Sequence, residues 1–243
     1  RRIASDVYRG LVKFNLTDLN VPDGVIITDA NLSLFFFRIP GSDNTGSRTH
    51  GVHKIQQSPA RPWKELEVTW NNYNSTDAWT SAGGDFAAGS TDNATFDSTA
   101  LNTWISWNVT VDVQDFYDNK SLNFGWIIKD EDESSNNWRR DYVSKESNAS
   151  GGIYRPKLEI TYTDITTPNV TGIRPFPGTH VNNGSSVDIY ANVTDNVNVS
   201  FVYANVTWDA TDQMVVMTDD DGDGTYNGTF TNTAQLGVYN VTI

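Results

Sequence analysis

Four aspartates at residues 219–224 form the clearest group of side chains that could act together chemically. In the stretch Asp219-Asp220-Asp221-Gly222-Asp223-Gly224, carboxylates stand at loop positions one, three and five, and glycine stands at position six. Alternate carboxylates converge on one cation and the glycine permits a tight turn, as in the first half of a calcium-binding loop. The twelfth position is Phe230, where a helical calcium-binding loop has a bidentate Glu. Two interpretations stay open: a Ca²⁺ site formed by Asp219, Asp221 and Asp223, or an Asp-Gly hairpin that needs no metal.

A second group combines aromatic and basic side chains at residues 138–142. One aromatic face beside two guanidinium groups suits a uronic acid, because the ring stacks on the sugar and the arginines bind its carboxylate through paired hydrogen bonds. Two further tryptophans lie in polar stretches, where a flat apolar ring needs a reason to be exposed. The residues predicted to bind carbohydrate are Trp138, Arg139, Arg140, Tyr142, Trp63 and Trp79.

Structural roles remain open for the same residues. The arginines could simply balance the acidic run at 130–133, and the tryptophans could anchor their loops. The acidic run itself could hold calcium or form a charged loop. The sequence does not choose between these interpretations.

Asparagine sequons point to an extracellular glycoprotein. The pattern Asn-x-Ser/Thr occurs about fourteen times, whereas chance would give roughly five occurrences. The alternative is that Asn-Val-Thr suits exposed strands, since Val and Thr favour sheets. The sites predicted to carry sugar are Asn74, Asn93, Asn148, Asn183 and Asn227.

Catalytic chemistry has little support in the sequence. The chain has three histidines, His50, His53 and His180, and no serine or cysteine nucleophile motif accompanies them. A polysaccharide lyase would need a base beside a group that neutralises a uronate, for which His53 with Arg48 or Lys54 is one combination. We expect no catalytic residues in this chain.

The elements that must position these residues are predicted to be β-strands. Runs with alternating apolar and polar side chains, separated by Gly, Asn, Asp and Ser, are typical of half-buried strands in a sandwich. Trp70 and Trp107 fall on such runs and are predicted to be core residues, and one short helical turn is expected at 113–117. The strands expected in the first part of the chain are 10–16, 27–35, 68–72, 107–113, 124–128 and 155–162.

A domain boundary is expected at residues 164–168, so that 1–163 and 164–243 form separate domains. Pro168, Pro175 and Pro177 favour an extended connection there over a strand. The spacing of about ten residues between the later strands indicates an immunoglobulin-like spacer whose last strand continues beyond Ile243. The strands expected in it are 186–194, 199–208, 213–218, 225–230 and 237–243. The predicted fold class is all-β: a jelly-roll-type β-sandwich followed by an immunoglobulin-like β-sandwich.

The charge and the cysteine content of the chain limit the classes of partner and cofactor that it can bind. The formal net charge is −13, and residues 164–243 contain Arg174 as their one basic residue against nine acidic residues. An acidic surface disfavours nucleic acid and anionic lipid. The absence of cysteine excludes disulfides and zinc-thiolate sites. No apolar run is long enough to span a bilayer, and the ends of the chain are interpreted as those of a fragment of a larger protein.

Seven sequence blocks, taken in order, resemble the DNRLRE-type domain related to carbohydrate-binding module family 96. Similar domains occur in surface and disaggregatase-related proteins of methanogenic archaea, which act on or adhere to an acidic envelope polysaccharide. The match covers residues 9–163, although Lys145 replaces the commoner Arg and the first family strand is incomplete. The blocks are Lys13-Phe14-Asn15, Ala30-Asn31-Leu32-Ser33-Leu34, 63–71, 107–110, Gly125-Trp126-Ile127-Ile128, Ser144-Lys145-Glu146 and 155–162.

This resemblance implies an extracellular, non-catalytic cell-surface module that binds or displays polysaccharide. Two alternatives remain: a structural subunit of an archaeal envelope or filament that assembles by edge-strand exchange, and the binding portion of a polysaccharide lyase or hydrolase. The expected partners are an envelope glycan, with other copies of the chain or neighbouring domains as further candidates. Calcium is the one cofactor considered.

Overall fold

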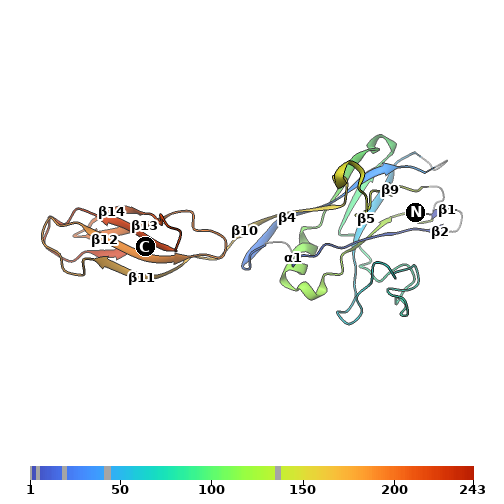
Figure 1. The fold of residues 1–243 in the computed structure, drawn as a ribbon. Coiled ribbons are helices and arrows are strands. Elements are labelled where there is room, and N and C mark those ends of the chain that lie inside the picture. The colour runs from blue at the N-terminus through green and yellow to red at the C-terminus, as the bar shows by residue number, and fades with distance from the viewer. Residues whose placement is uncertain (1, 4–5, 18–20, 41–44, 135–137) are drawn as a thin grey trace. The chain divides into compact units, whose positions relative to one another are not determined.

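The chain divides into two compact units in the computed structural model, which describes residues 2–3, 6–17, 21–40, 45–134 and 138–243. Unit 1 consists of residues 1–20 and 26–163, and unit 2 consists of residues 21–25 and 164–243 (Figure 1). The regular secondary structure of both units is mainly antiparallel sheet. The prediction of an all-β chain built from β-sandwiches is confirmed.

Unit 1 contains two four-stranded sheets and a small β1–β2 pair. One sheet has the order β3-β8-β5-β6, and the other has the order β10-β4-β7, with β9 also pairing with β4. The strands are β1 (Arg2–Ile3), β2 (Asp6–Val7), β3 (Gly10–Val12), β4 (Val25–Arg38), β5 (Arg48–Lys54), β6 (Asp92–Phe96), β7 (Thr103–Asn108), β8 (Trp126–Asp130), β9 (Asp141–Tyr142) and β10 (Lys157–Asp164). The helical segments are α1 (Thr110–Asp118) and the 3₁₀ turns η1 (Ser98–Ala100), η2 (Lys120–Leu122) and η3 (Ala149–Gly152).

The two sheets of unit 1 enclose an aromatic core. Trp107 on β7 is fully buried, and its indole Nε1 donates a hydrogen bond of 2.8 Å to the carbonyl of His50 on the opposite sheet. Phe36 on β4 meets Phe96 on β6 edge to face, with 5.3 Å between ring centroids. Large aromatic rings thus supply much of the buried area of a chain that has few apolar residues.

Helix α1 replaces the second half of the strand predicted at 107–113. The strand ends at Asn108, whose Oδ1 accepts a hydrogen bond from the backbone N–H of Thr110 as the helix begins. Val113 and Phe116 are buried at helical spacing, so the helical turn expected at 113–117 is confirmed and is longer than predicted. The alternation at 109–113 also fits one buried helix face, which explains the error.

The segment between β5 and β6 is a long loop that packs its own side chains. The strand predicted at 68–72 is absent from it, and Trp70, predicted to be a core residue, is 39% exposed. Tyr73 and Trp79 are the buried aromatic residues of this loop, and Trp79 Nε1 donates to the carbonyl of Thr69. The loop is therefore held by a local aromatic pair and by backbone hydrogen bonds within it, and not by a continuous β-ladder.

Unit 2 is a sandwich of two three-stranded sheets, with the orders β11-β12-β15 and β14-β13-β16. Its core contains Trp208 and Phe230, whose rings meet edge to face at 5.5 Å, together with inward-facing aliphatic residues of β12, β13 and β14. The strands are β11 (Asn169–Phe176), β12 (Val187–Thr194), β13 (Val202–Trp208), β14 (Thr211–Met217), β15 (Thr225–Phe230) and β16 (Asn240–Thr242).

Strand β11 contradicts the extended connection that the prolines predicted. It pairs with β12 at the edge of its sheet, with a register shift between Thr171 and Arg174. Pro175 lies within the strand, opposite Ile189. An edge strand can accept proline because only one of its sides needs a complete ladder, which the sequence argument did not consider.

Candidate functional site

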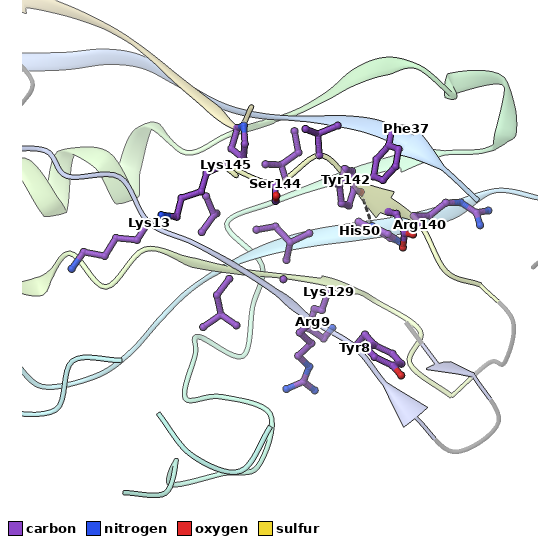
Figure 2. A pocket seen from close by; sticks show the side chains of 18 of the residues that line it. Tyr8, Arg9, Lys13, Phe37, His50, Lys129, Arg140, Tyr142, Ser144 and Lys145 are labelled. Carbon is purple, nitrogen blue, oxygen red and sulfur yellow. Dashed lines mark hydrogen bonds between the residues drawn. The ribbon is translucent and has the colours of Figure 1, made fainter. Parts of the chain in front are cut away.

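A groove of about 940 Å³ in unit 1 brings together residues that are far apart in the sequence. Residues 8–15, which include β3, line one side, and residues 139–145, which include β9, line the other (Figure 2). His50 on β5 and residues 128–130 on β8 contribute to the rest of the wall. The groove therefore lies between the edge of one sheet and the strand that β9 adds to the other.

Strand β3 reaches this position because Gly125 allows a close backbone approach. Gly125 has a φ of +76°, and a Cβ there would lie 2.1 Å from the carbonyl oxygen of Val12. On the other side, the Arg9 guanidinium donates to the Glu133 carboxylate and to the carbonyl of Gly83. These contacts fix the backbone of residues 8–15 and turn the Arg9 charge away from the groove (Figure 2).

The groove is basic in a chain that is strongly acidic overall. Among the described residues that line it, seven are Lys or Arg and three are Asp or Glu, whereas the whole chain has a formal charge of −13. The six cations other than Arg9 define what we call the basic groove: Lys13, Arg38, Lys129, Arg139, Arg140 and Lys145.

Ion pairs hold several of these cations in place. Asp141 accepts hydrogen bonds from Arg38 and also contacts Arg139. Lys145 lies 3.0 Å from Glu146 and 3.1 Å from Glu65, and these hydrogen bonds raise the pKa of Lys145. A charged, exposed ammonium therefore remains at the mouth of the groove across the neutral range.

Lys13 and Arg140 mark opposite ends of the groove (Figure 2). Lys13 is exposed, and its ammonium lies 6.0 Å from the ring centroid of Phe124. Arg140 is buried and donates hydrogen bonds to the main-chain carbonyls of Gly46 and Arg139. Lys13 is thus placed to contact a ligand directly, while Arg140 supplies positive charge from inside the wall.

His50, which is buried, and Tyr142, which is half-buried, form a hydrogen-bonded pair in the wall. His50 Nδ1 lies 2.7 Å from the Tyr142 hydroxyl, and His50 Nε2 is buried without a hydrogen-bond partner. Burial, followed by nearby positive charges that include Arg140 and Arg48, lowers the pKa of His50 to about 3. Burial also raises the pKa of the Tyr142 hydroxyl well above its usual value. Both side chains are therefore neutral throughout the physiological pH range.

The structure brings four of the six predicted carbohydrate-binding residues to the groove. Arg139, Arg140, Tyr142 and Trp63 line it. Trp63 is half-buried, and its Nε1 donates to the carbonyl of Phe124, so one edge of its ring is fixed.

The other two predicted residues, Trp138 and Trp79, do not line the groove. The Arg48 guanidinium stacks 4.8 Å from the ring centroid of Trp138 and covers one of its faces. Trp79 is only 5% exposed and anchors its loop. Burial at this position cannot be read from the polar residues around it in the sequence.

The acidic run at 130–133 forms ion pairs with basic side chains. Arg48 contacts Asp130 and Asp132, and Arg9 contacts Glu133. Glu131 contacts the buried His53, which was considered as a lyase base and whose other ring nitrogen faces the carbonyl of Ala87. These contacts agree with the charged-loop interpretation of the run.

Sequence reasoning missed Lys13, Lys145 and Phe37 as site residues. The available signal was that basic side chains are concentrated in residues 1–163, while the rest of the chain has one. The pairing of residues 8–15 with residues 139–145 across a groove depends on tertiary structure, which no spacing in the sequence reveals.

The predicted metal ligands come together in unit 2. Oxygen atoms of Asp219, Asp221 and Asp223 all lie within 4.8 Å of one another. Asp219 also accepts hydrogen bonds from the backbone N–H groups of Gly222, Asp223 and Gly224, and these lower its pKa. The loop is thus ordered as a hairpin turn by hydrogen bonds from main-chain N–H groups to the Asp219 carboxylate, and its carboxylates have a spacing that suits Ca²⁺.

The predicted glycosylation sites differ in the exposure and the hydrogen bonding of their asparagine side chains. Asn148, Asn183 and Asn227 are exposed. Asn74 Nδ2 donates to Asp77 at 2.8 Å, and Asn93 Nδ2 donates to Ser90 at 2.7 Å.

Comparison with known protein families identifies one that this chain matches. A family model described as the disaggregatase related repeat domain matches residues 2–160, which is more than half of the chain. A search of curated proteins found no match. In the part of the chain that the structure describes, no helix has the length and apolar character needed to cross a membrane. The basic groove lies within the matched region, and the chain belongs to the disaggregatase related repeat family.

Proposed function

We propose that this chain is a non-catalytic, extracellular cell-surface module whose basic groove binds a polysaccharide that carries carboxylate or other anionic groups. The observation that carries the proposal is the excess of Lys and Arg in the groove of a chain with a formal charge of −13. Membership of a family named for disaggregatase supports a role at a cell surface. A positive cleft in an acidic molecule attracts anionic ligands selectively.

The shape and lining of the groove suit a chain of sugar rings. Its volume of about 940 Å³ is at the upper end of the usual range for ligand sites. Tyr8 and Phe37 line it and are 52% and 39% exposed, so their rings offer apolar faces to a sugar. Stacking on these rings and hydrogen bonds to lysine and arginine would together recognise an acidic sugar.

The hydrogen-bonded pair in the wall supports a binding role and not a catalytic one. Burial lowers the pKa of His50 to about 3 and raises the pKa of Tyr142 well above its usual value, so both groups titrate far from neutral pH. A general acid or base works best when its pKa lies near the working pH. Unit 2 is proposed to act as a spacer that displays the groove.

Charge reversal in the groove tests this proposal. We expect Lys13→Glu combined with Lys145→Glu to weaken binding to polygalacturonate at least tenfold, because both ammonium groups are exposed at the groove. Binding is measured by affinity electrophoresis or calorimetry at two salt concentrations, and raising the salt should weaken wild-type binding. Lys120→Glu is the matched control, since Lys120 is exposed but does not line the groove.

Equal affinity of the two variants for polygalacturonate would contradict the proposal, as would wild-type binding to neutral dextran of equal strength. Ordered multimers without affinity for any polysaccharide would instead support the alternative of a structural subunit. Release of unsaturated or reducing sugar ends from polygalacturonate would show that the module is catalytic.

A further inference from the structure

The strands of unit 2 repeat one pattern on their outer faces. In residues 164–243, all of which the structure describes, five of the six strands contain Asn-x-Thr. In four of them the middle residue is a valine that belongs to the core or packs against it. In β15 it is Gly228, where a Cβ would lie 2.5 Å from the carbonyl oxygen of Val216. Since side chains alternate along a strand, the Asn and the Thr then share the outer face. The five sequons begin at Asn169, Asn192, Asn205, Asn227 and Asn240.

Four of these sequons lie on exposed outer faces of the sheets. Asn169, Asn192, Asn227 and Asn240 are exposed, and so is the threonine two residues after each. Asn205 differs, because it is half-buried and its Oδ1 is enclosed without a hydrogen-bond partner. The four exposed sites come from both sheets: three from β11, β12 and β15, and one from β16.

The alternation of inward and outward side chains along a strand does not by itself explain why asparagine occurs at these positions. It explains why polar residues face outward, but Asn is disfavoured in strands, whereas Thr, Tyr and Val are favoured. In each of these strands the less suitable residue is followed two positions later by Thr, which is the spacing that N-glycosylation requires. Strand pairing does not require asparagine at these positions. Asn192 and Asn240 lie opposite threonines of neighbouring strands, and any side chain that forms hydrogen bonds could stand in their place.

We propose that unit 2 is N-glycosylated on its strands, at Asn169, Asn192 and Asn240 in addition to Asn227. At each site the side-chain amide nitrogen would form a bond to the anomeric carbon of an oligosaccharide. The bond that breaks joins this carbon to a phosphate oxygen of a lipid-linked oligosaccharide donor, which leaves as the lipid phosphate while the amide proton passes to a base. Modification precedes the pairing of the strands, and the sugars then project from the finished sheets.

This arrangement would give unit 2 a covering of sugar on both faces. On one sheet, Asn227 lies opposite Tyr190, so a glycan at Asn227 starts beside the ring of a tyrosine. On the other sheet, Asn240 lies opposite Thr207 on β13. The proposal is independent of the basic groove, because no residue of unit 2 lines that groove.

Mass spectrometry of glycopeptides tests the proposal. The full chain is produced in the secretory pathway of a host that N-glycosylates, and the same chain made in a bacterial cytoplasm serves as the sugar-free reference. Enzymatic removal of glycans in ¹⁸O water converts each modified Asn to labelled Asp, so each site is read separately. We expect label at the exposed strand sites of both sheets.

Matched variants separate glycosylation from a structural role of the threonine. Thr194→Ala should abolish label at Asn192, and Thr194→Ser should retain it, because the modification requires a hydroxyl at this position. Thr194 is exposed, so both variants should fold, and circular dichroism checks this. Absence of label from all four strand sites overturns the proposal, whether or not the loop sequons at Asn148 and Asn183 are occupied. Equal labelling of Asn192 in the two variants overturns it as well.

Discussion

At the scale of single residues, His50 makes the stability of unit 1 depend on pH. Burial first, and then positive charges that include Arg140 and Arg48, lower its pKa from 6.5 to about 3. Below pH 6.5 the unfolded chain therefore binds a proton that the folded unit does not bind until about pH 3. Because the unfolded state holds more protons in this window, stability falls as the pH falls from 6.5 toward 3. The slope approaches about 1.4 kcal/mol per pH unit.

We expect His50→Gln to remove most of this slope between pH 6.5 and 5, where most carboxylates remain ionised. The measurement is urea unfolding of unit 1 at several pH values, followed by tryptophan fluorescence. Parallel pH profiles for the wild type and the variant would show that the buried imidazole is not responsible.

The chemistry that a side chain offers was easier to predict from the sequence than its burial. Arg139, Arg140 and Tyr142 were recognised from their own chemistry, and they line the groove. The same reasoning placed Trp70 in the core and Trp79 at a ligand, whereas Trp70 is exposed and Trp79 is buried. Both lie in one long loop, where burial is decided by tertiary packing and not by local alternation.

At the scale of elements, the aspartate loop between β14 and β15 offers a test for calcium. If its carboxylates bind the ion, millimolar Ca²⁺ should raise the melting temperature of unit 2, because a ligand of the folded state stabilises it. We expect Asp221→Ala to abolish this shift, since Asp221 belongs to the carboxylate cluster. Asp220→Ala is the matched control, because Asp220 lies outside the cluster. Calorimetry with calcium and with a chelator provides the measurement.

A wild-type chain that does not respond to calcium would leave the hairpin turn as the whole explanation of the loop. Asp219→Ala should then still destabilise the turn, because Asp219 accepts three backbone N–H groups.

Most elements could be predicted because they have a two-residue period. The strands of unit 2 at 187–194, 202–208 and 225–230 alternate inward and outward side chains, and the predicted strands match their ends to within three residues. Two failures have physical causes. The residues of α1 fit either a helix or a strand over a short window, and Pro175 is tolerated because β11 is an edge strand.

At the scale of the whole molecule, the separate hydrophobic cores predict separate responses to mutation. Ile127 is buried in unit 1, and Ile189 is buried in unit 2. We expect Ile127→Ala to destabilise unit 1 and Ile189→Ala to destabilise unit 2, each by about 2–5 kcal/mol. Hydrogen exchange read by mass spectrometry reports on peptides of each unit in one experiment, and each variant is the control for the other. Equal loss of protection in both units would show that they unfold as one body.

The division of charge follows the same boundary. Nearly all basic residues lie in residues 1–163, and residues 164–243 have Arg174 alone. The sequence showed this asymmetry, but it could not show that cations of unit 1 gather in a groove, since segments far apart in the chain form it.

The edge strand β11 affects how copies of this sheet behave when they lie close together. Many identical sheets held close together are at risk of joining through their open edges into amyloid-like stacks. Pro175 has no N–H to offer such a neighbour, and the register shift after Thr171 bends the strand out of line. This side of the sheet is therefore a poor template for fibril growth between neighbouring copies.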